Sequence, residues 1–466
     1  MTDLSTAGVA ETARQIISGA TTARTAVDAA LDRIAALDGG LNAFSVVLAD
    51  RVRAEADARD RQLAGGETPG PLHGVPIAIK EEIDVEGAVT TFGGDANETP
   101  AAADGEVVRR LRAAGAVVIG KTTMPEFGAF PYTESVSRGI TRNPWDRSRT
   151  PGGSSGGTAV AVATGMVPVG IGGDGGGSIR IPSACCGLFG LKPQRGRVSN
   201  APHPHLWWAL GTVGPLSRGV LDSALVYDAI RGNVDGDLYQ AGESGSFVEA
   251  AGREPGRLRI GWSTRAAIPG IRPDPLHVAA VEETVRLLTD LGHDVREVNP
   301  RYPDTTAAFV PQFFAGIRTE ADHVEHYDRL ERRTRQTYRM GAWVRPKVID
   351  KALELTEKVS RKANRVFDEV DVLLTPAIAH RPPKVGILGG RGTVASALVS
   401  QPAIAYVAVW NVAGNPAASV PCGIGPDGLP TAVQLVGRTD AETTLLSLSA
   451  QIEAARPFPR WSAGDN

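Results

Sequence analysis

The apolar positions of this chain follow two patterns, one with helical spacing and one of short continuous runs. Apolar and charged residues alternate at helical spacing over 9–38 and 43–64, which predicts two amphipathic helices. Short, nearly continuous apolar runs instead predict buried strands, and the first of these runs from Val75 to Lys80. Similar runs predict further strands at 116–119, 167–172, 257–262, 293–298, 372–374, 417–420 and 431–436.

Helical stretches separate most of these strands. They cover 104–114, 220–231, 275–291, 304–334, 341–370, 404–413 and 440–454. Strands that alternate with helices along a whole chain indicate an α/β layered fold. Residues 232–257 have the composition of an exposed connector, and residues 376–400 have that of a loop that could form a lid. No change in composition is sharp enough to predict a second domain.

Composition narrows the function classes mainly by exclusion. The chain has a formal net charge of −3, and its Lys and Arg residues are spread out rather than gathered in the basic stripe of a nucleic-acid-binding protein. The most apolar run, Ala159 to Gly173, is too short and too rich in glycine to span a bilayer. The first 16 positions lack the basic and apolar regions of a signal peptide. We therefore expect neither a nucleic-acid partner nor a membrane partner.

The cysteines and histidines carry no strong signal of their own. Cys185, Cys186 and Cys422 make a poor disulfide framework because their number is odd and two are adjacent, which favours a reducing cytoplasm. His203 and His205 have the spacing of half a metal site, but no Cys or acidic residue stands nearby at ligand spacing. We expect a loop pair there, and neither a metal nor another cofactor.

Two glycine-rich turns with serines stand out between Pro151 and Pro193. The first holds Ser154 and Ser155, and the second holds Ser178. Glycine at this density is useful where the backbone must pass very close to a ligand or to another segment. The pattern predicts a site built from backbone N–H groups and serine hydroxyls.

Several interpretations of these turns compete. A phosphate-binding loop requires Lys and then Ser or Thr after the glycines, and neither turn has them. Residues 153–157 fit the G-x-S-x-G nucleophile elbow, but no buried strand precedes them, as that motif requires. Tight turns in a large fold explain one such segment better than two. A serine hydrolase without histidine is the fourth interpretation.

A serine nucleophile needs a base, and none of the eight histidines lies in the turns. A buried lysine can serve, because desolvation disfavours the ammonium form. Lys80, at the end of an apolar strand, is the lysine best placed for that role, although a surface lysine is the simpler interpretation of Lys80 taken alone. The N–H groups of Gly175, Gly176 and Gly177 are suited to an oxyanion hole.

The motifs as a set resemble the amidase signature family. They are GVPIAIKE (74–81), GKTTMPEF (120–127), TRNPWDRSRTPGGSSGG (141–157), GDGGGSIRIPSACCGLFGLKP (173–193) and GNPAASVP (414–421), in the family's order. The resemblance covers Gly74 to about Gly437. It implies a single α/β/α domain over 1–466 with a mixed sheet covered by helices. Its parts would be N-terminal helices over about 1–66, a signature core over about 72–232 and a C-terminal part over about 257–455.

The same resemblance implies a Ser–cis-Ser–Lys triad. The nucleophile would be Ser178, the bridging serine would be Ser154 after a cis Gly153–Ser154 bond, and the base would be Lys80. Ser178 would attack an amide carbonyl, an acyl-enzyme would form as the amine leaves, and water would release the acid. Ser155, Asp174 and Arg180 are implied to support the turns.

Two departures bear on the substrate. Glutaminase-type A subunits of glutamyl-tRNA(Gln) amidotransferase typically carry an acidic residue where this chain has Ile404, seven positions before Asn411. They also carry a serine-rich stretch where this chain has Ala209 to Thr212. We therefore expect a stand-alone amidase for an apolar or aromatic amide, with the amidotransferase subunit as the alternative. A hydrolase of oligomeric or cyclic amides and a non-catalytic scaffold rank below both. The residues expected to line the substrate pocket are Tyr132, Trp207 and Trp208, and a homodimer is left open.

Overall fold

A computed structural model describes residues 4–463 of the chain, so the predicted ranges that run to either terminus extend beyond it. One sheet of 11 strands runs through the molecule in the order β1-β3-β2-β6-β8-β7-β12-β13-β11-β9-β10. A separate two-stranded sheet pairs β4 (Glu134–Ser135) with β5 (Gly139–Ile140). The strands of the large sheet are β1 (Phe44–Val47), β2 (Pro76–Lys80), β3 (Val117–Thr122), β6 (Val169–Gly173), β7 (Phe189–Lys192), β8 (Val213–Ser217), β9 (Arg259–Trp262), β10 (Asp294–Glu297), β11 (Val372–Pro376), β12 (Ala417–Ile424) and β13 (Pro430–Gly437).

The large sheet is mixed, which confirms the predicted fold class. β2 pairs in parallel with both β3 and β6, and β9 pairs in parallel with both β10 and β11. The strands between these two parallel groups pair antiparallel. Strands from the N-terminal and C-terminal parts of the chain therefore share one hydrogen-bonded sheet.

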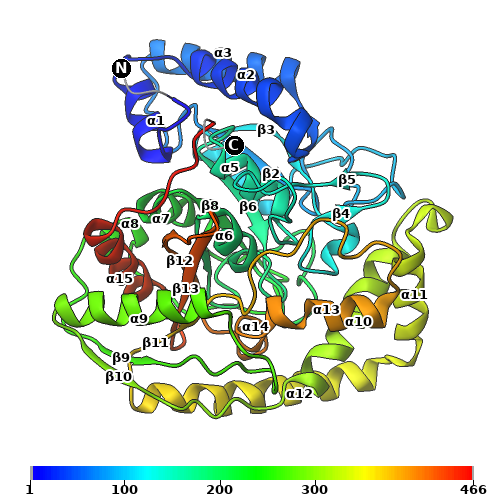
Figure 1. The fold of residues 1–466 in the computed structure, drawn as a ribbon. Coiled ribbons are helices and arrows are strands. Elements are labelled where there is room, and N and C mark those ends of the chain that lie inside the picture. The colour runs from blue at the N-terminus through cyan, green and yellow to red at the C-terminus, as the bar shows by residue number, and fades with distance from the viewer. Residues whose placement is uncertain (1–3, 464–466) are drawn as a thin grey trace.

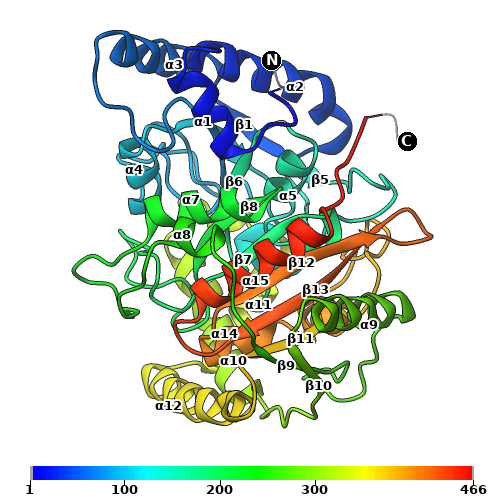
Figure 2. The same ribbon diagram turned by 90° about the vertical axis from the view of Figure 1, so that its left-hand side faces the viewer.

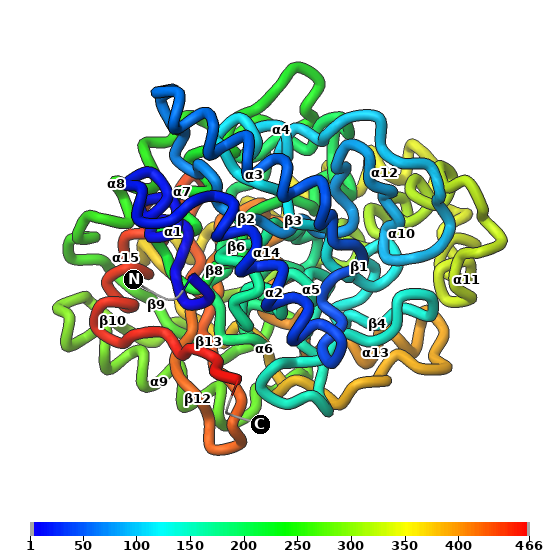
Figure 3. Tube along the Cα trace, turned by 90° about the horizontal axis from the view of Figure 1, so that it is seen from above, coloured from blue at the N-terminus to red at the C-terminus, as the bar shows by residue number. Residues whose placement is uncertain are grey.

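Helices cover both faces of the sheet. Figure 1 shows α2 and α3 along one end of the molecule and α12 at the opposite end, and Figure 2 shows α7, α8 and α15 lying together on one side. Figure 3 shows α10, α11 and α13 gathered on the side away from α9 and α15. The α-helices are α1 (Val9–Ile17), α2 (Ala23–Leu41), α3 (Ala49–Ala64), α4 (Glu106–Ala113), α5 (Gly156–Ala163), α6 (Arg180–Cys186), α7 (Val220–Ile230), α8 (Phe247–Ala251), α9 (Pro275–Asp290), α10 (Thr306–Asp322), α11 (Arg332–Met340), α12 (Pro346–Ala363), α13 (Thr393–Ile404), α14 (Ala408–Ala413) and α15 (Glu442–Ala455).

The central strands are apolar on both faces, as their continuous apolar runs predict. Along β2, Ile77 and Ile79 enter one core cluster with residues of α4, α7 and α15, whereas Ala78 enters the other with residues of α2 and α5. Successive side chains of a strand point to opposite faces. A strand covered by helices on both sides must therefore be apolar throughout.

Several predicted helices are wrong in their extent. The helix predicted over 9–38 is two helices, because Gly19 takes a left-handed conformation and Thr22 caps α2 by accepting from Thr25 N–H. The helix predicted over 43–64 begins with strand β1, which pairs antiparallel with β3. Phe44, Val46 and Val47 are residue types that favour strands, and they gain more from pairing at the sheet than from extending a helix.

The two long helices predicted in the C-terminal half are also divided. The range 304–334 contains α10, a short 3₁₀ turn and the start of α11. The range 341–370 starts with a 3₁₀ turn, and α12 begins at Pro346, a residue that favours the first turn of a helix. The stretch 376–400, predicted to be a loop, includes the first part of α13. Among residues 4–463, no helix is both long and apolar enough to cross a membrane.

Candidate active site

Lys80 ends β2, a strand whose side chains are all buried. Because β2 is parallel to β6, the carboxyl ends of both strands reach the same edge of the sheet. At this edge the Nζ of Lys80 donates a hydrogen bond to the Oγ of Ser154 over 2.8 Å and another to the carbonyl oxygen of Gly173 over 3.4 Å. Lys80 is only 1% exposed, so the simpler interpretation of Lys80 as a surface lysine is wrong.

The turn with Ser154 lies directly before α5 and contains a cis Gly153–Ser154 peptide bond. Ser154 is 2% exposed. Gly128 lies against its hydroxyl: a Cβ added at position 128 would come within 3.1 Å of the Ser154 Oγ, and the φ of +64° there also favours glycine. The close approach of Gly128 encloses the hydroxyl that accepts from Lys80.

Ser155 joins the two glycine turns. Its N–H donates to the carbonyl oxygen of Ser178 (3.3 Å), and its hydroxyl donates to the carbonyl oxygen of Gly173 (3.2 Å). Ser155 is wholly buried. The hydrogen bonds hold the two turns side by side at the edge of the sheet.

Asp174 organises the second turn from a fully buried position after β6. Its carboxylate accepts hydrogen bonds from the N–H groups of Gly177 (2.7 Å) and Ile179 (3.2 Å). It also accepts from both Nε and Nη2 of Arg180, each at 3.0 Å. Burial opposes ionisation of Asp174, but the charge and hydrogen bonds of Arg180 outweigh it and hold the pKa of Asp174 well below its ordinary value.

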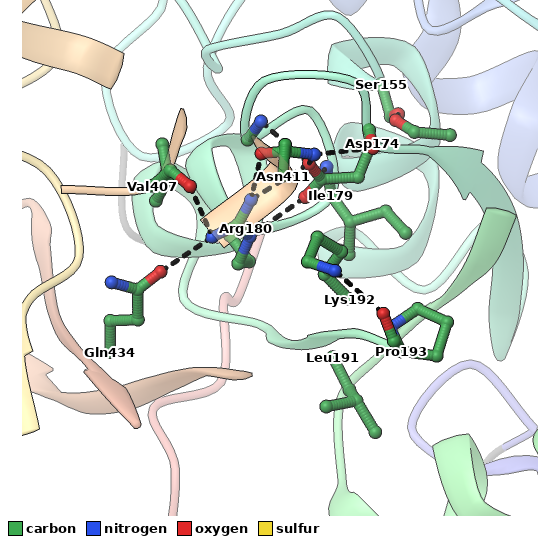
Figure 4. A network of polar contacts seen from close by, with 12 residues as sticks. Ser155, Asp174, Ile179, Arg180, Leu191, Lys192, Pro193, Val407, Asn411 and Gln434 are labelled. Atoms are coloured by element: carbon green, nitrogen blue, oxygen red, sulfur yellow. Dashed lines mark hydrogen bonds and ion pairs between the residues drawn. The ribbon is translucent and has the colours of Figure 1, made fainter. Parts of the chain in front are cut away.

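Arg180 connects the turn to the C-terminal part of the chain, as Figure 4 shows. Its Nη1 donates to the carbonyl oxygen of Val407 (3.0 Å) and to the Oε1 of Gln434 (2.8 Å), and its Nη2 donates to the Oδ1 of Asn411 (2.6 Å). The Nδ2 of Asn411 donates in turn to the carbonyl and carboxylate oxygens of Asp174, each at 2.8 Å. Such a fully bonded buried pair fixes the geometry of the turn.

A second buried lysine, Lys192 at the end of β7, lies next to this network (Figure 4). Its Nζ donates to the carbonyl oxygen of Pro193 over 2.8 Å. Burial and the charge of Arg180 lower the pKa of Lys192 to about 7, although Asp174 opposes them. Burial therefore weakens the charge of Lys192, and Arg180 is the cation that is hydrogen-bonded to Asp174.

Ser178 lies on the open side of the same turn. Ser178, Gly175 and Gly176 are partly exposed. Within residues 4–463, the Ser178 hydroxyl and the N–H groups of Gly175, Gly176 and Ser178 make no hydrogen bond, whereas the N–H of Gly177 is taken by Asp174. Three unbonded donors beside a partly exposed hydroxyl can bind an oxygen atom of a ligand.

Aromatic rings surround this open side. A Cβ at Gly175 would come within 3.0 Å of the Trp207 indole, and one at Gly176 within 3.5 Å of the Phe309 ring. Phe313 lies edge-on to Trp207 with 5.5 Å between ring centroids, and it stacks on Phe309 at 6.3 Å. The absence of side chains at these glycines thus leaves room for the aromatic rings to lie against the turn.

Trp208 packs against other residues than Trp207 does, although both have a positive φ (59° for Trp208 and 50° for Trp207). Trp208 stacks on His205 with 4.4 Å between the ring centroids, and its backbone N–H donates to the Nδ1 of His205. His203 is exposed. No group of three or more His, Cys, Asp or Glu residues in the described part of the chain could hold a metal ion.

Tyr132, the third residue predicted for the pocket, packs behind the first turn. It is 4% exposed, and its hydroxyl donates to the carbonyl oxygen of Val399 (2.9 Å). Its backbone nitrogen lies 2.9 Å from where a Cβ of Gly153 would be. A role in the substrate pocket stays a prediction for Tyr132.

Comparison with protein families matches residues 25–446 to the family described as Amidase. The chain belongs to the amidase signature family. Its relatives include a protein of Mycobacterium tuberculosis named "Putative amidase AmiB2", which is 50% identical over 460 residues, or 98% of each chain. The protein is thus an amidase, an enzyme that hydrolyses the C–N bond of amides.

Solved structures agree with this assignment. The amidase is similar to 6-aminohexanoate cyclic dimer hydrolase, with a TM-score of 0.92, 29% identity and coverage of 99% of each chain. It is also similar to a bacterial aryl acylamidase of the amidase signature enzymes, with a TM-score of 0.87, 27% identity and coverage of 97% of this chain and 96% of the other. Both likenesses extend over nearly the whole chain.

Several residues that the fold brings to the site of the amidase were not predicted from the sequence. Asn411 was used only to mark the position of Ile404, and no role was predicted for Gln434, Phe309 or Phe313. They lie on α10, α14 and β13, far from the glycine turns in the chain. Glu82 was also missed, although it follows Lys80 by two positions.

Proposed function

We propose that the amidase works through Ser178 as nucleophile, Ser154 as a proton bridge and Lys80 as base. The observation that carries the proposal is the buried 2.8 Å hydrogen bond from Lys80 to Ser154, in a turn bonded to the Ser178 turn through Ser155. A lysine enclosed in this way has a defined proton partner, as general-base catalysis requires.

In the proposed mechanism, the proton that Ser178 loses during attack is later returned to the leaving nitrogen. As Ser178 Oγ bonds to the amide carbonyl carbon, its proton moves to Ser154 and the Ser154 proton moves to neutral Lys80. As the C–N bond breaks, the proton returns through Ser154 to the leaving nitrogen, which yields an acyl-enzyme and an amine or ammonia. Water then attacks the acyl carbon along the same path and releases the carboxylic acid.

The negative oxygen that forms during attack would be held by the unbonded N–H groups of Gly175, Gly176 and Ser178. Each such donor is worth about 3 kcal/mol in the transition state. Gly177, predicted as a third donor of the glycine run, would act mainly by letting its N–H bond to Asp174 at a φ of +119°.

The proposed substrate is an amide with an apolar or aromatic acyl group. Support comes from Trp207, Phe309 and Phe313 around the open side of the turn, and from the similarity to an aryl acylamidase and a cyclic amide hydrolase. The resemblance adds support, because glutaminase-type A subunits typically carry an acidic residue where this chain has Ile404, and such a residue would pair with the ammonium of glutamine.

The same proposal treats the chain as one catalytic domain, because its N-terminal and C-terminal parts contribute strands to one sheet. Cys185, Cys186 and Cys422 are buried and free, in keeping with a reducing compartment such as the cytoplasm.

The decisive experiment compares the purified protein with Ser178→Ala and Lys80→Ala against aliphatic, aromatic and peptide amides and glutamine. Ammonia or free amine is measured. Each variant should lose at least about 10³-fold in kcat/KM while keeping the wild-type circular dichroism spectrum. A fluorophosphonate probe should label Ser178 in the wild type only. Full activity in folded Lys80→Ala would overturn the proposed base.

A further inference from the structure

A carboxylate contacts the lysine of the site. The chain turns directly after β2, where the N–H of Ile83 donates to the carbonyl oxygen of Lys80. The turn brings the Oε1 of Glu82 to 3.0 Å from the Lys80 Nζ, and the two side chains are 11% and 1% exposed. Glu81, between them, instead bonds to Thr91 and lies 3.8 Å from Lys121.

Two glycines leave the room that this carboxylate occupies. A Cβ at Gly173 would lie only 2.0 Å from the Oε1 of Glu82. A Cβ at Gly128 would lie 3.6 Å from its Oε2 and 3.1 Å from the Oγ of Ser154. The carboxylate, the ammonium and the serine hydroxyl therefore meet in one enclosed space. In the described part of the chain, the Oε1 of Glu82 has no hydrogen-bond partner and only its ion pair with Lys80.

On its other side, Glu82 faces a cavity of about 60 Å³ that Asp84 and Glu320 also line. Burial raises the pKa of Glu320 to about 8, with contributions from the charges of Glu82 and Asp84. Glu320 is therefore less readily ionised than an exposed glutamate. The remaining titratable groups around the cavity are Glu106, which pairs with Arg109 and Arg110, and His203 and His205.

We propose that Glu82 is a positioning residue that holds the ammonium form of Lys80 and thereby sets the pH range in which the amidase is active. The inference rests on the proposed role of Lys80 as base. When the Ser178 proton reaches Lys80 through Ser154, the new positive charge forms 3.0 Å from a carboxylate instead of unpaired in the interior. The same contact stabilises the charged form of the lysine relative to the neutral form that accepts the proton, so removing the carboxylate should widen the active pH range toward acid.

The test is the pH dependence of kcat/KM for Glu82→Gln, measured from pH 5 to 10 with the best amide from the screen. The variant keeps the size of the side chain and removes its charge. We expect the acid limb of the profile, where kcat/KM falls with decreasing pH, to move at least about one pH unit lower. An opposite charge at this distance shifts the pH of an ionisation by about 1–3 units. The plateau at high pH should fall at the same time, because the remaining base is weaker. An acid limb that stays at the wild-type pH would overturn the inference.

Glu320→Gln is the matched control, because it makes the same change in the same cavity without touching Lys80. In the described part of the chain the ion pair of Lys80 is with Glu82 and not with Glu320, so the Glu320 variant should keep the wild-type acid limb. An equal shift in both variants would show that the charge of the cavity acts, not the contact with Lys80, and would also overturn the inference.

Glu82→Asp covers the case in which Glu82→Gln does not fold. It keeps the charge but shortens the side chain by one methylene, so its acid limb should move in the same direction by a smaller amount, and no shift would count against the inference. Lys80→Ala separates the two proposals. Activity in that variant would remove the proposed function, whereas an inactive Lys80→Ala with an unmoved limb in the Glu82 variants removes only this inference.

Discussion

The turn that carries Ser178 has a closed side and an open side, and they are built in opposite ways. On the closed side Asp174 and Arg180 are wholly buried, and Arg180 bonds to Asn411, Gln434 and the backbone as well as to Asp174. On the open side Gly175 and Gly176 are partly exposed, and their N–H groups have no acceptor within residues 4–463.

The difference shows how a turn can keep unbonded donors. Free N–H groups would ordinarily find an acceptor by small backbone movements, because an unmade hydrogen bond is costly. Arg180, which is paired with Asp174, ties the turn to Asn411 of α14 and Gln434 of β13, and these bonds oppose such movements. The hydrogen bonds of the closed side therefore keep the free N–H groups of the open side in fixed positions. Oxyanion binding requires donors that are fixed in this way.

The largest effect is expected from breaking the closed side with Asp174→Asn. The amide cannot balance the charge of Arg180, so at pH 7 the free energy of unfolding should fall by about 3–5 kcal/mol, the usual cost of leaving a buried charge unpaired. kcat/KM should fall as well, because the donors lose their fixed positions. Denaturant unfolding measures the first effect and amide hydrolysis measures the second.

The same variant gives a pH signature. Because the pKa of Asp174 is lowered in the folded protein, its contribution to stability is complete above the ordinary Asp value of about 4 and is lost as the pH falls below it. The stability difference between wild type and Asp174→Asn should therefore be constant from pH 5 to 7 and narrow below pH 4. A difference that stays the same at low pH would show that the charge of Asp174 is not what anchors the turn.

A smaller effect is expected on the open side from Trp207→Ala. Removing the indole beside Gly175 should change the preference between aromatic and small aliphatic amides by about tenfold or more, since pocket contacts of this kind are worth 1–3 kcal/mol. Relative kcat/KM values for two such amides measure it. Trp208→Ala is the matched control, because Trp208 stacks on His205 and should leave the preference unchanged.

The smallest effect is expected from Tyr132→Phe, behind the first turn. The change removes one hydrogen bond to the Val399 carbonyl and should lower the free energy of unfolding by about 1 kcal/mol. kcat/KM should stay near the wild-type value for every amide tested. A change in substrate preference would instead return Tyr132 to the pocket where the sequence analysis expects it.

Local sequence was a good guide to the centre of the fold. The strand 75–80 and the strands at 116–119 and 431–436 are confirmed, because residues buried on both faces must be apolar and leave a clear pattern. Helix ends were less predictable. The division at Gly19 depends on one backbone conformation, and β1 exists because β3 is there to pair with it.

By itself, the sequence determined the layered α/β class and, through motifs spread over the chain, the amidase signature family with Lys80, Ser154 and Ser178 as its candidate residues. Only the tertiary structure decided which distant groups meet them. Asn411 and Gln434 bond to Arg180 across 231 and 254 positions, which no local pattern records. Two glutamates follow Lys80, and only the turn after β2 decides that Glu82 contacts the lysine while Glu81 faces Lys121. The physical reason is that charge pairing depends on distances of a few ångströms in space, which the folded backbone alone sets.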